Sequence, residues 1–247
     1  MTQLSKLIID AHHSAKLISA PEELIPTSLE SAYHTQNQLL DLLDDHIGGW
    51  KVGTGDQAYP VFASLIPNKW LFSDETIIAK ELCSLMGIEL EYAFRLKNID
   101  QISINISLED LEKHISDVAA AIEIVSTRLQ GWPDLPTYLK AADLQSNGAL
   151  IIGPAQPYRS NLFNFNEPII SLTDNLIEKS TLRGKNPAGD PRLLIPKFID
   201  QQRQFGRHIN DDHWITTGSL SGIFFVDYKT NITGTINGLP SVHLKVV

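Results

Sequence analysis

Apolar residues recur at helical spacing in the first part of the chain. Leu4 and Ile8 begin a stripe that continues to residue 15 and predicts an amphipathic helix. A second helix is predicted from Thr27, because its hydroxyl can cap the first turn while Glu30 stands three residues on and completes a capping box. The glycines that begin at Gly48 end this helix, so the chain is expected to open with a helical segment, residues 1–48.

The pattern then changes to the two-residue period of strands. From Ile88 to Leu96 apolar and polar positions alternate strictly, which predicts a strand with Glu89 and Glu91 on one face and Leu90 on the other. Shorter apolar runs predict further strands at residues 50–52, 120–125, 149–152, 214–217, 223–227 and 242–247. Residues 53–73 are rich in turn formers and are predicted as a loop.

Two later helices are predicted from capping residues. Ser107 with Asp110 indicates a helix start, and apolar positions as far as Val118 extend it. Asp190 followed by proline predicts a helix that runs to residue 205, bent at Pro196. Helices lead and closely spaced strands follow, so the pattern favours an α+β fold in one domain over alternating β-α-β units.

Composition narrows the class of partner. The 247 residues include 20 Lys and Arg against 29 Asp and Glu, a formal net charge of −9, which argues against nucleic acid or an anionic membrane surface as the main partner. The single cysteine, Cys83, excludes an internal disulfide and a multi-cysteine zinc cluster. The N-terminal stretch lacks the apolar region of a signal peptide, and no apolar run is long enough to span a membrane, so we expect a cytoplasmic protein.

Three glutamates are the strongest chemical signal. Glu89 and Glu91 leave the same face of one strand about 6.5–7 Å apart at Cα. Glu123 lies in a wholly apolar strand, where a carboxylate is costly to bury unless it is paired or metal-bound. Carboxylates without histidine or thiol favour Mg²⁺ or Mn²⁺ over Zn²⁺. The alternative is a solvated face for the first two and an ion pair of Glu123 with Arg95 or Arg128.

Lys51 is the second candidate. It stands between apolar neighbours inside a glycine-flanked strand, where it is either a partly buried functional lysine or a surface lysine whose stem covers apolar groups. The following stretch, residues 53–58, matches a dinucleotide-binding fingerprint, but Tyr59-Pro60 prevents the helix that this fingerprint requires.

A glycine-rich stretch, Thr217 to Gly222, follows an apolar strand. Its backbone amides can hold an anion such as a substrate carboxylate, or it is a plain glycine turn. It does not fit the nucleophile elbow of hydrolases. The eight histidines show no metal-binding spacing and are predicted to lie at the surface.

Five motifs in chain order resemble the hydratase/decarboxylase branch of the fumarylacetoacetate hydrolase superfamily. They are Gly49-Trp50-Lys51-Val52-Gly53, Glu89-Leu90-Glu91-Tyr92-Ala93-Phe94, Ala121-Ile122-Glu123-Ile124-Val125 with Arg128, Ala142-Asp143 through Ser146-Asn147-Gly148, and Thr217-Gly218-Ser219-Leu220. They are similar to the family's G-W-K-V-G, E-P-E-I-A-F, A-I-E-I-V-D-S-R, A-D-N-A-S-x-G and T-G-S-L. The resemblance identifies residues 49–247 as a catalytic domain of this type, on which residues 1–48 pack.

The resemblance implies a mixed, largely antiparallel β-roll or barrel with flanking helices, and a homo-oligomer. It implies that Glu89, Glu91 and Glu123 hold Mg²⁺ or Mn²⁺, on which a small 2-oxo acid binds and forms a stabilised enolate. Lys51 then supplies a cationic hydrogen bond or a proton. The remaining implied substrate-binding residues are Asp143, Ser146, Gly218 and Ser219.

The chain also departs from the family motifs. Val61 stands where hydratases carry an aspartate, Ser126 replaces the aspartate after E-I-V, and Leu144-Gln145 replaces asparagine and alanine. The implied function is a metal-dependent lyase resembling 2-oxopent-4-enoate hydratase. The departures leave two alternatives: a decarboxylase of the 4-oxalocrotonate type, which mainly needs an electron sink, or a non-catalytic relative that binds metal or ligand.

Overall fold

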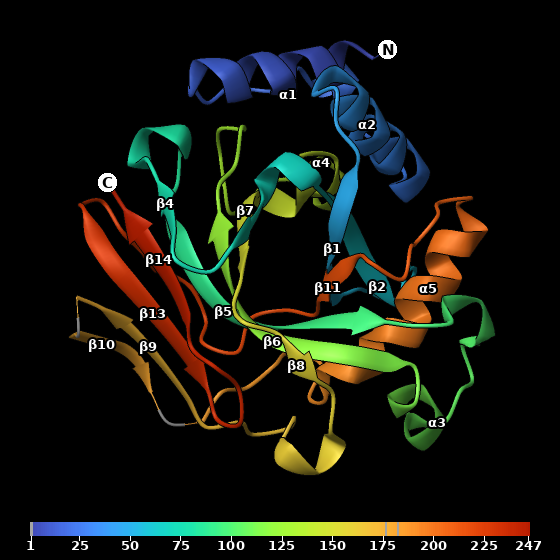
Figure 1. Ribbon diagram of the computed structural model, residues 1–247. Coiled ribbons are helices and arrows are strands. Elements are labelled where there is room, and N and C mark those ends of the chain that lie inside the picture. The colour runs from blue at the N-terminus through green and yellow to red at the C-terminus, as the bar shows by residue number, and fades with distance from the viewer. Residues whose placement is uncertain (1, 176, 182) are drawn as a thin grey trace.

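Two curved sheets form the body of the computed structural model, with helices over one end and one side (Figure 1). The structure describes residues 2–175, 177–181 and 183–247, without the side chains of residues 178, 180 and 181. The helices are α1 (Gln3–Ser14), α2 (Leu29–Leu42), α3 (Leu108–Glu112), α4 (Thr137–Ala142) and α5 (Leu194–Gln204). None of the described helices is long and apolar enough to cross a membrane.

The larger sheet has nine strands and contains the candidate site. Its strands are β1 (Ile47–Thr54), β2 (Val61–Pro67), β3 (Leu71–Ser73), β5 (Gly87–Leu96), β6 (Ile115–Val125), β7 (Asn147–Ile152), β8 (Gln156–Pro157), β11 (Trp214–Thr216) and β12 (Phe224–Phe225). The order is β2-β1-β11-β5-β6-β7-β3, with β12 paired to β5 and β8 to β6. All pairings are antiparallel except β1 with β11 and β3 with β7.

The smaller sheet has five strands in the order β10-β9-β13-β14-β4. These are β4 (Thr76–Ile78), β9 (Ile170–Asp174), β10 (Ile177–Thr181), β13 (Thr230–Ile236) and β14 (Val242–Val246). It packs against the face of β5 and β6 that carries Leu90 and Ile122. Gly234 allows this contact, because a Cβ there would lie 2.6 Å from a Leu90 methyl. The opposite face of β5 and β6, which carries the glutamates, is left for the site.

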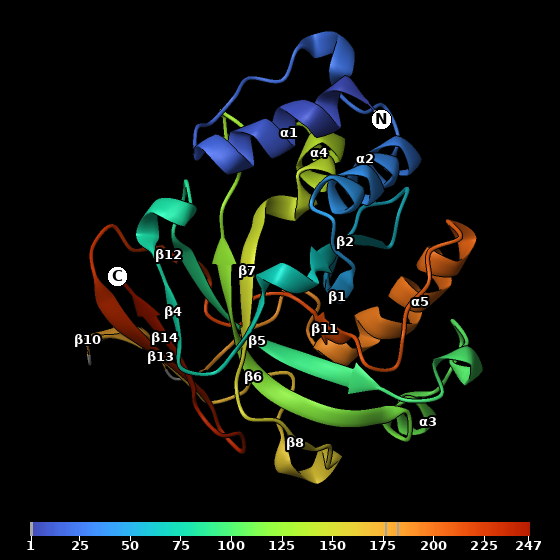
Figure 2. The same ribbon diagram turned by 45° about the horizontal axis from the view of Figure 1, so that its top comes forward.

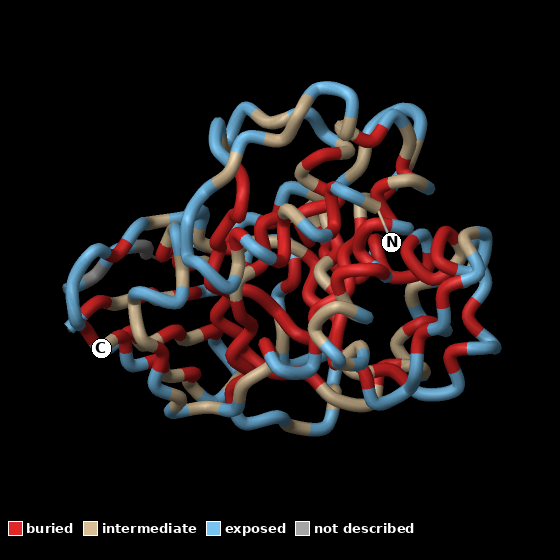
Figure 3. Tube along the Cα trace, turned by 90° about the horizontal axis from the view of Figure 1, so that it is seen from above, coloured by how far each residue is buried: buried red, intermediate tan, exposed pale blue. Residues whose placement is uncertain are grey.

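Helices α1 and α2 lie over the end of the larger sheet, with α4 below them (Figures 1 and 2). Helix α5 packs beside β1, where Phe198 contacts Trp50 at 5.4 Å between ring centroids. Buried segments fill the centre and exposed segments the rim (Figure 3), and one hydrophobic cluster reaches from Leu4 to Val246. The predicted α+β class with a mixed, largely antiparallel sheet is confirmed, whereas the division at residues 48 and 49 stays a prediction.

Several local predictions were wrong. The second helix is capped by Ser28 with Ser31, not by Thr27 with Glu30. The helix predicted to reach Val118 ends at Glu112, because the chain turns into β6 and its apolar residues pair with β5.

The predicted loop at residues 53–73 contains β2, β3 and a short 3-10 turn. Pro196 lies in the first turn of α5, where a missing N–H removes no helical hydrogen bond. A 3-10 turn at Pro191–Leu193 precedes α5.

Candidate metal centre

Three carboxylates meet on adjacent strands of the larger sheet. Glu89 and Glu91 alternate with apolar residues along β5, and the β5–β6 register places Glu123 directly opposite Glu89. One carboxylate oxygen from each of the three lies within 4.8 Å of the others. Side chains of a strand share a face at every second residue, so the alternation read from the sequence positions this cluster.

Two of the three glutamates are buried, Glu89 is partly exposed, and the cluster is incompletely hydrogen-bonded. Glu91 and Glu123 have no exposed area. Glu91 Oε2 accepts from the Gly218 N–H at 3.2 Å, and Glu123 Oε1 accepts from Asn147 Nδ2 at 3.0 Å. Glu91 Oε1 and Glu123 Oε2 have no partner among the described residues. Buried carboxylate oxygens without donors are costly, and a cation between them would remove that cost.

Lys51 is the cation that the fold supplies. It reaches the cluster from β1, two strands away from β5, and its Nζ donates to Glu123 Oε1 at 2.7 Å and to the Gln145 carbonyl at 3.3 Å. Its side chain is 14% exposed, so it is a mostly buried lysine and not a surface one. One ammonium faces three carboxylates, so two negative charges are left without a counter-charge when all three glutamates are ionised.

Neither arginine considered for Glu123 pairs with it. Arg128 binds Asp143, with Nε and Oδ1 2.5 Å apart, and Arg95 lies over the Trp214 ring. The sequence could not show that Lys51 is the partner of Glu123. Lys51 is brought to Glu123 only by the pairing of β1 with β11 and of β11 with β5.

Burial and crowding shift the acid–base properties of the cluster. Burial raises the pKa of Glu91 well above its ordinary value, and the charges of Glu123 and Glu89 raise it further. Burial also raises the pKa of Glu89, although Lys51 opposes it. Burial alone would lower the pKa of Lys51, but the charges of Glu123, Glu89 and Glu91 outweigh it and raise the pKa. Lys51 is therefore protonated at neutral pH.

The donor set fits a hard divalent cation. Carboxylate oxygens alone, with no histidine or thiol beside them, are the ligands of Mg²⁺ and Mn²⁺. Two oxygens without a donor among the described residues, and the excess negative charge, both favour such an ion. Glu89, Glu91 and Glu123 would hold it.

A left-handed turn lies beside the cluster. Leu144, Gln145 and Ser146 have φ values of 52°, 50° and 58° in succession, a conformation that costs free energy in non-glycine residues. Asp143 begins this turn and is fully buried; its carboxylate accepts from Arg128 and from the hydroxyl of Thr127. The structure thus places Asp143 in the support of the turn, outside the glutamate cluster.

The glycine-rich turn at residues 217–222 supplies a backbone donor. Gly218 has φ +97° and directs its N–H to Glu91. Asn186 is buried, and its Nδ2 donates to the carbonyls of Thr217 and Gly218 at 2.8 and 2.9 Å. Ser219 lies beside Glu89. Burial raises the pKa of Glu89, and a hydrogen bond from the Ser219 hydroxyl partly offsets this rise. Gly218 and Ser219 therefore lie beside Glu91 and Glu89 of the cluster.

A cavity of about 430 Å³ opens beside the cluster. Its lining is Lys51, Phe62, Glu89, Val125, Trp132, Thr137, Lys140, Ala141, Gln145, Ser146 and Ile223. Predicted residues Lys51, Glu89 and Ser146 therefore share one cavity. A volume of this size accommodates a small organic acid.

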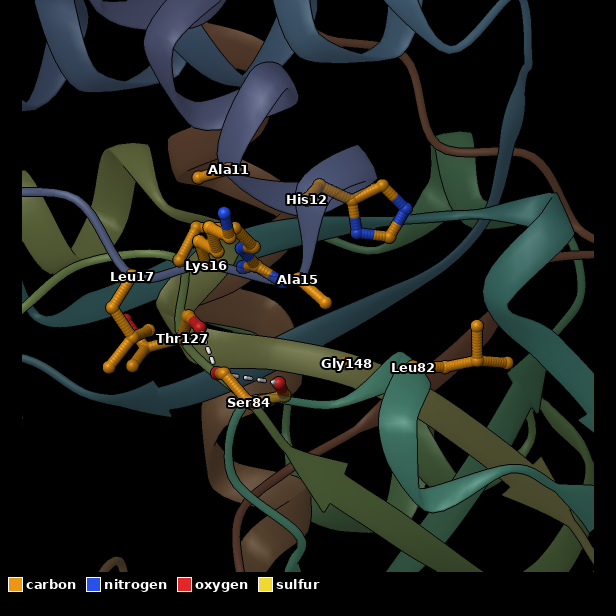
Figure 4. A pocket seen from close by; sticks show the side chains of 11 residues that line it. Ala11, His12, Ala15, Lys16, Leu17, Leu82, Ser84, Thr127 and Gly148 are labelled. Carbon is orange, nitrogen blue, oxygen red and sulfur yellow. Dashed lines mark hydrogen bonds between the residues drawn. The ribbon is translucent and has the colours of Figure 1, made fainter.

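The positions that depart from the family motifs differ in their surroundings. Val61 is fully buried, and the β1–β2 register places it on the face of Trp50, which packs against α5, while Phe62 faces the cavity. Ser126 lies near Ser84, at a separate hollow of about 20 Å³ beneath α1 (Figure 4). The residues lining that hollow include no carboxylate.

Sequence reasoning missed several residues of the site. Asn147, Gln145 and Asn186 were not selected, because a single amide in a loop carries no spacing signal. The surface prediction was wrong for His213, which is 5% exposed and accepts from Trp50 Nε1 at 3.0 Å. This contact fixes the tryptophan that precedes Lys51.

A scan against protein-family models finds no match. Among solved structures, a 4-oxalocrotonate decarboxylase from Pseudomonas putida G7, complexed with magnesium and adipate, superposes with a TM-score of 0.83 at 18% identity, over 99% of this chain and 96% of that one.

A fumarylpyruvate hydrolase from Pseudomonas aeruginosa, with Mn²⁺ and pyruvate, matches with a TM-score of 0.56 at 17% identity over 80% and 88% of the chains. A 2-hydroxyhepta-2,4-diene-1,7-dioate isomerase from Mycobacterium marinum matches with a TM-score of 0.55 at 15% identity, over 82% of this chain and 76% of that one. The chain thus has the fold of the fumarylacetoacetate hydrolase superfamily.

Proposed function

We propose that this protein is a divalent-metal-dependent lyase of the fumarylacetoacetate hydrolase superfamily, acting on a small 2-oxo acid as a decarboxylase. The observation that carries the proposal is the three-glutamate cluster, in which two buried oxygens have no partner among the residues that the structure describes. The metal-complexed solved structures of the same fold support it. When bound, a Mg²⁺ or Mn²⁺ ion would act as a Lewis acid that stabilises negative charge on the 2-oxo group.

The protein's own groups orient the substrate and hold a proton. Lys51 Nζ is fixed by Glu123 and by the Gln145 carbonyl, and it lines the cavity in its protonated form. It can donate a hydrogen bond to developing negative charge and return a proton to carbon after CO₂ leaves. Ser146 lines the cavity and is suited to position the substrate carboxylate, while the turn at Gly218 holds Glu91. Phe62 and Ile223 add apolar surface to the cavity lining.

The cavity offers few proton-transferring groups, and decarboxylation is a reaction that requires few of them. The lining residues include one glutamate, Glu89, which belongs to the candidate metal ligands, and two lysines. Val61 lies on the far face of β2, so no side chain at that position faces the cavity. A 2-oxopent-4-enoate hydratase is the second candidate, because Lys51 can also supply the proton that hydration adds to carbon.

The test is a product assay with Mg²⁺-saturated protein. We expect loss of the substrate's absorbance and release of CO₂ from 4-oxalocrotonate, and no turnover by Glu91→Ala. Consumption of 2-hydroxypentadienoate without CO₂ would identify a hydratase instead. A fully active Glu91→Ala variant would overturn the metal mechanism, and metal binding without turnover of either acid would indicate a non-catalytic relative. The homo-oligomer and the cytoplasmic location stay predictions.

A further inference from the structure

Among the described residues three arginines are buried, and one of them lacks a counter-charge. Arg128 is paired with Asp143, and Arg192 is paired with Asp190. Arg207 is 8% exposed and forms no ion pair with any residue that the structure describes. A buried cation without an anion beside it costs free energy, so the described part of the protein leaves this charge unbalanced.

Uncharged groups hold Arg207 in place. Its Nη1 donates to Gln202 Oε1 at 3.1 Å and its Nη2 to Gln36 Oε1 at 2.9 Å, while its buried Nε has no acceptor among the described residues. The guanidinium carbon lies 4.4 Å from the centre of the Tyr33 ring and 4.8 Å from that of Trp50. Burial lowers the pKa of Arg207 to about 10, which leaves the side chain protonated at neutral pH.

Arg207 lines a cavity of about 490 Å³ beside α2. The lining comes from α2 with its cap and from the chain at and just after the end of α5. The Tyr33 and Phe205 rings meet edge to face, with 5.1 Å between their centroids, and form an aromatic wall. Glu30 is the acidic residue of the lining; it is exposed and forms no ion pair with Arg207. A ligand in this cavity would meet a buried guanidinium and an aromatic surface.

This cavity is separate from the glutamate cluster. Trp50, whose ring contacts Arg207, precedes Lys51 on β1, and neighbouring residues of a strand face opposite sides of the sheet. Lys51 reaches the glutamates, so Arg207 lies on the other side of β1. The two cavities share no lining residue. A ligand at Arg207 is therefore independent of the proposed function.

We propose that Arg207 and Asn37 bind the carboxylate of a small organic acid at a second site, away from the glutamate cluster. Asn37 is exposed and lines the same cavity, and guanidinium and amide N–H groups both donate to carboxylate oxygens. One cation beside the exposed Glu30 favours an anion with a single charge over the two charges of phosphate. The aromatic wall favours a ligand whose body is apolar and flat.

The experiment compares benzoate with its uncharged analogue benzamide by calorimetric titration of the metal-free protein. We expect benzoate to bind at least about tenfold more tightly, since a charged hydrogen-bonded pair contributes that much. Arg207→Met should abolish this preference. Arg183→Met is the matched control, because Arg183 is exposed and paired with Glu167. Addition of Mg²⁺ and oxalate should leave the affinity for benzoate within about twofold, because the two cavities share no residue.

Two substitutions of exposed residues test the site even if Arg207→Met fails to fold. Asn37→Ala should weaken the binding of benzoate severalfold, and Glu30→Gln should strengthen it severalfold by removing a negative charge from the lining. Equal affinity of the wild type for benzoate and benzamide would overturn the proposal. So would a preference that persists in Arg207→Met, or benzoate binding that neither Asn37→Ala nor Glu30→Gln changes. Tighter binding of inorganic phosphate than of benzoate would overturn the assignment to an organic carboxylate.

Discussion

Two buried ionic clusters lie a few residues apart in this molecule, and they are built in opposite ways. In the Arg128–Asp143 pair both carboxylate oxygens accept hydrogen bonds, and Arg128 also donates to the carbonyls of Asn147 and Asp143 at 2.7 Å. In the glutamate cluster two oxygens accept none from described residues, and three acids face one lysine. The first cluster is complete in the protein alone, whereas the second leaves two carboxylate oxygens without a donor among the described residues.

The complete cluster supports the incomplete one. Asp143 begins the left-handed turn, Gln145 within it accepts from Lys51, and Asn147 at its end donates to Glu123. The ion pair therefore holds a costly backbone conformation that positions two groups of the site. Buried charge alone does not mark function here; the difference lies in whether the protein satisfies it.

Breaking the complete cluster should give the largest change in stability. Arg128→Met leaves Asp143 buried without its counter-ion, and we expect a loss of about 3–5 kcal/mol in the free energy of unfolding. Urea denaturation of the metal-free protein measures it. Arg183→Met is the control, because the Arg183–Glu167 pair is exposed and should contribute under about 1 kcal/mol. Equal losses in the two variants would contradict the contrast between the clusters.

Removing a charge from the incomplete cluster should act in the opposite direction. Glu91→Gln relieves repulsion among the carboxylates, so the metal-free protein should become more stable while Mg²⁺ affinity falls about 100-fold or more, a difference of about 2.7 kcal/mol. Denaturation and calorimetric titration give the two values. Glu109→Gln on the exposed side of α3 should change neither. A Glu91→Gln protein that is less stable and binds Mg²⁺ normally would identify Glu91 as structural.

The glycine-rich turn offers a smaller test of the support around the ligands. Asn186→Ala removes the two hydrogen bonds that fix the carbonyls of Thr217 and Gly218, so the Gly218 N–H should no longer be held toward Glu91. We expect about tenfold weaker Mg²⁺ binding, as for other groups that orient metal ligands. Calorimetry checks this, with exposed Asn237→Ala as the control. Unchanged affinity would show that the turn does not depend on Asn186.

The pH dependence gives the smallest and most specific effect. Burial raises the pKa of Glu91 and of Glu89 in the folded state, so their stabilising contribution is complete below the unfolded pKa of about 4.5 and is lost as pH rises through the folded values. The metal-free protein should therefore lose stability above about pH 4.5, and Glu91→Gln should lose less. Saturating Mg²⁺ should cancel the loss. Identical pH profiles for wild type and Glu91→Gln would refute this.

The sequence predicted the glutamate cluster better than its surroundings. Glu89 and Glu91 follow from strict alternation, and Glu123 stands out because its neighbours are all apolar. The partner of Glu123 could not be predicted, because Lys51 reaches it through three strands that are distant in the chain. Hydrophobic periodicity is a local property, and non-local strand pairing is not encoded in it.

Because hydrophobic periodicity is local, it also failed to predict strands β13 and β2 and the left-handed turn. Strand β13 carries threonine and a glycine, Gly234, at positions where apolar residues would signal a strand. A glycine lies there because the backbone approaches Leu90 too closely for a Cβ. Strand β2 follows a turn-rich stretch and was included in it. The left-handed turn at Leu144–Ser146 has no glycine to announce it, since the Arg128–Asp143 pair stabilises it from outside.

In the proposed function, the glutamate cluster is a metal site on which a 2-oxo acid binds. The most direct measurement is calorimetric titration of metal-free protein with Mg²⁺ and with Mn²⁺, with and without oxalate as a mimic of the 2-oxo acid head. We predict one ion bound per chain, with tighter binding when oxalate is present. No binding in either condition would contradict the account, and the three glutamates would then be a buried ionic cluster neutralised by Lys51 and by protonation.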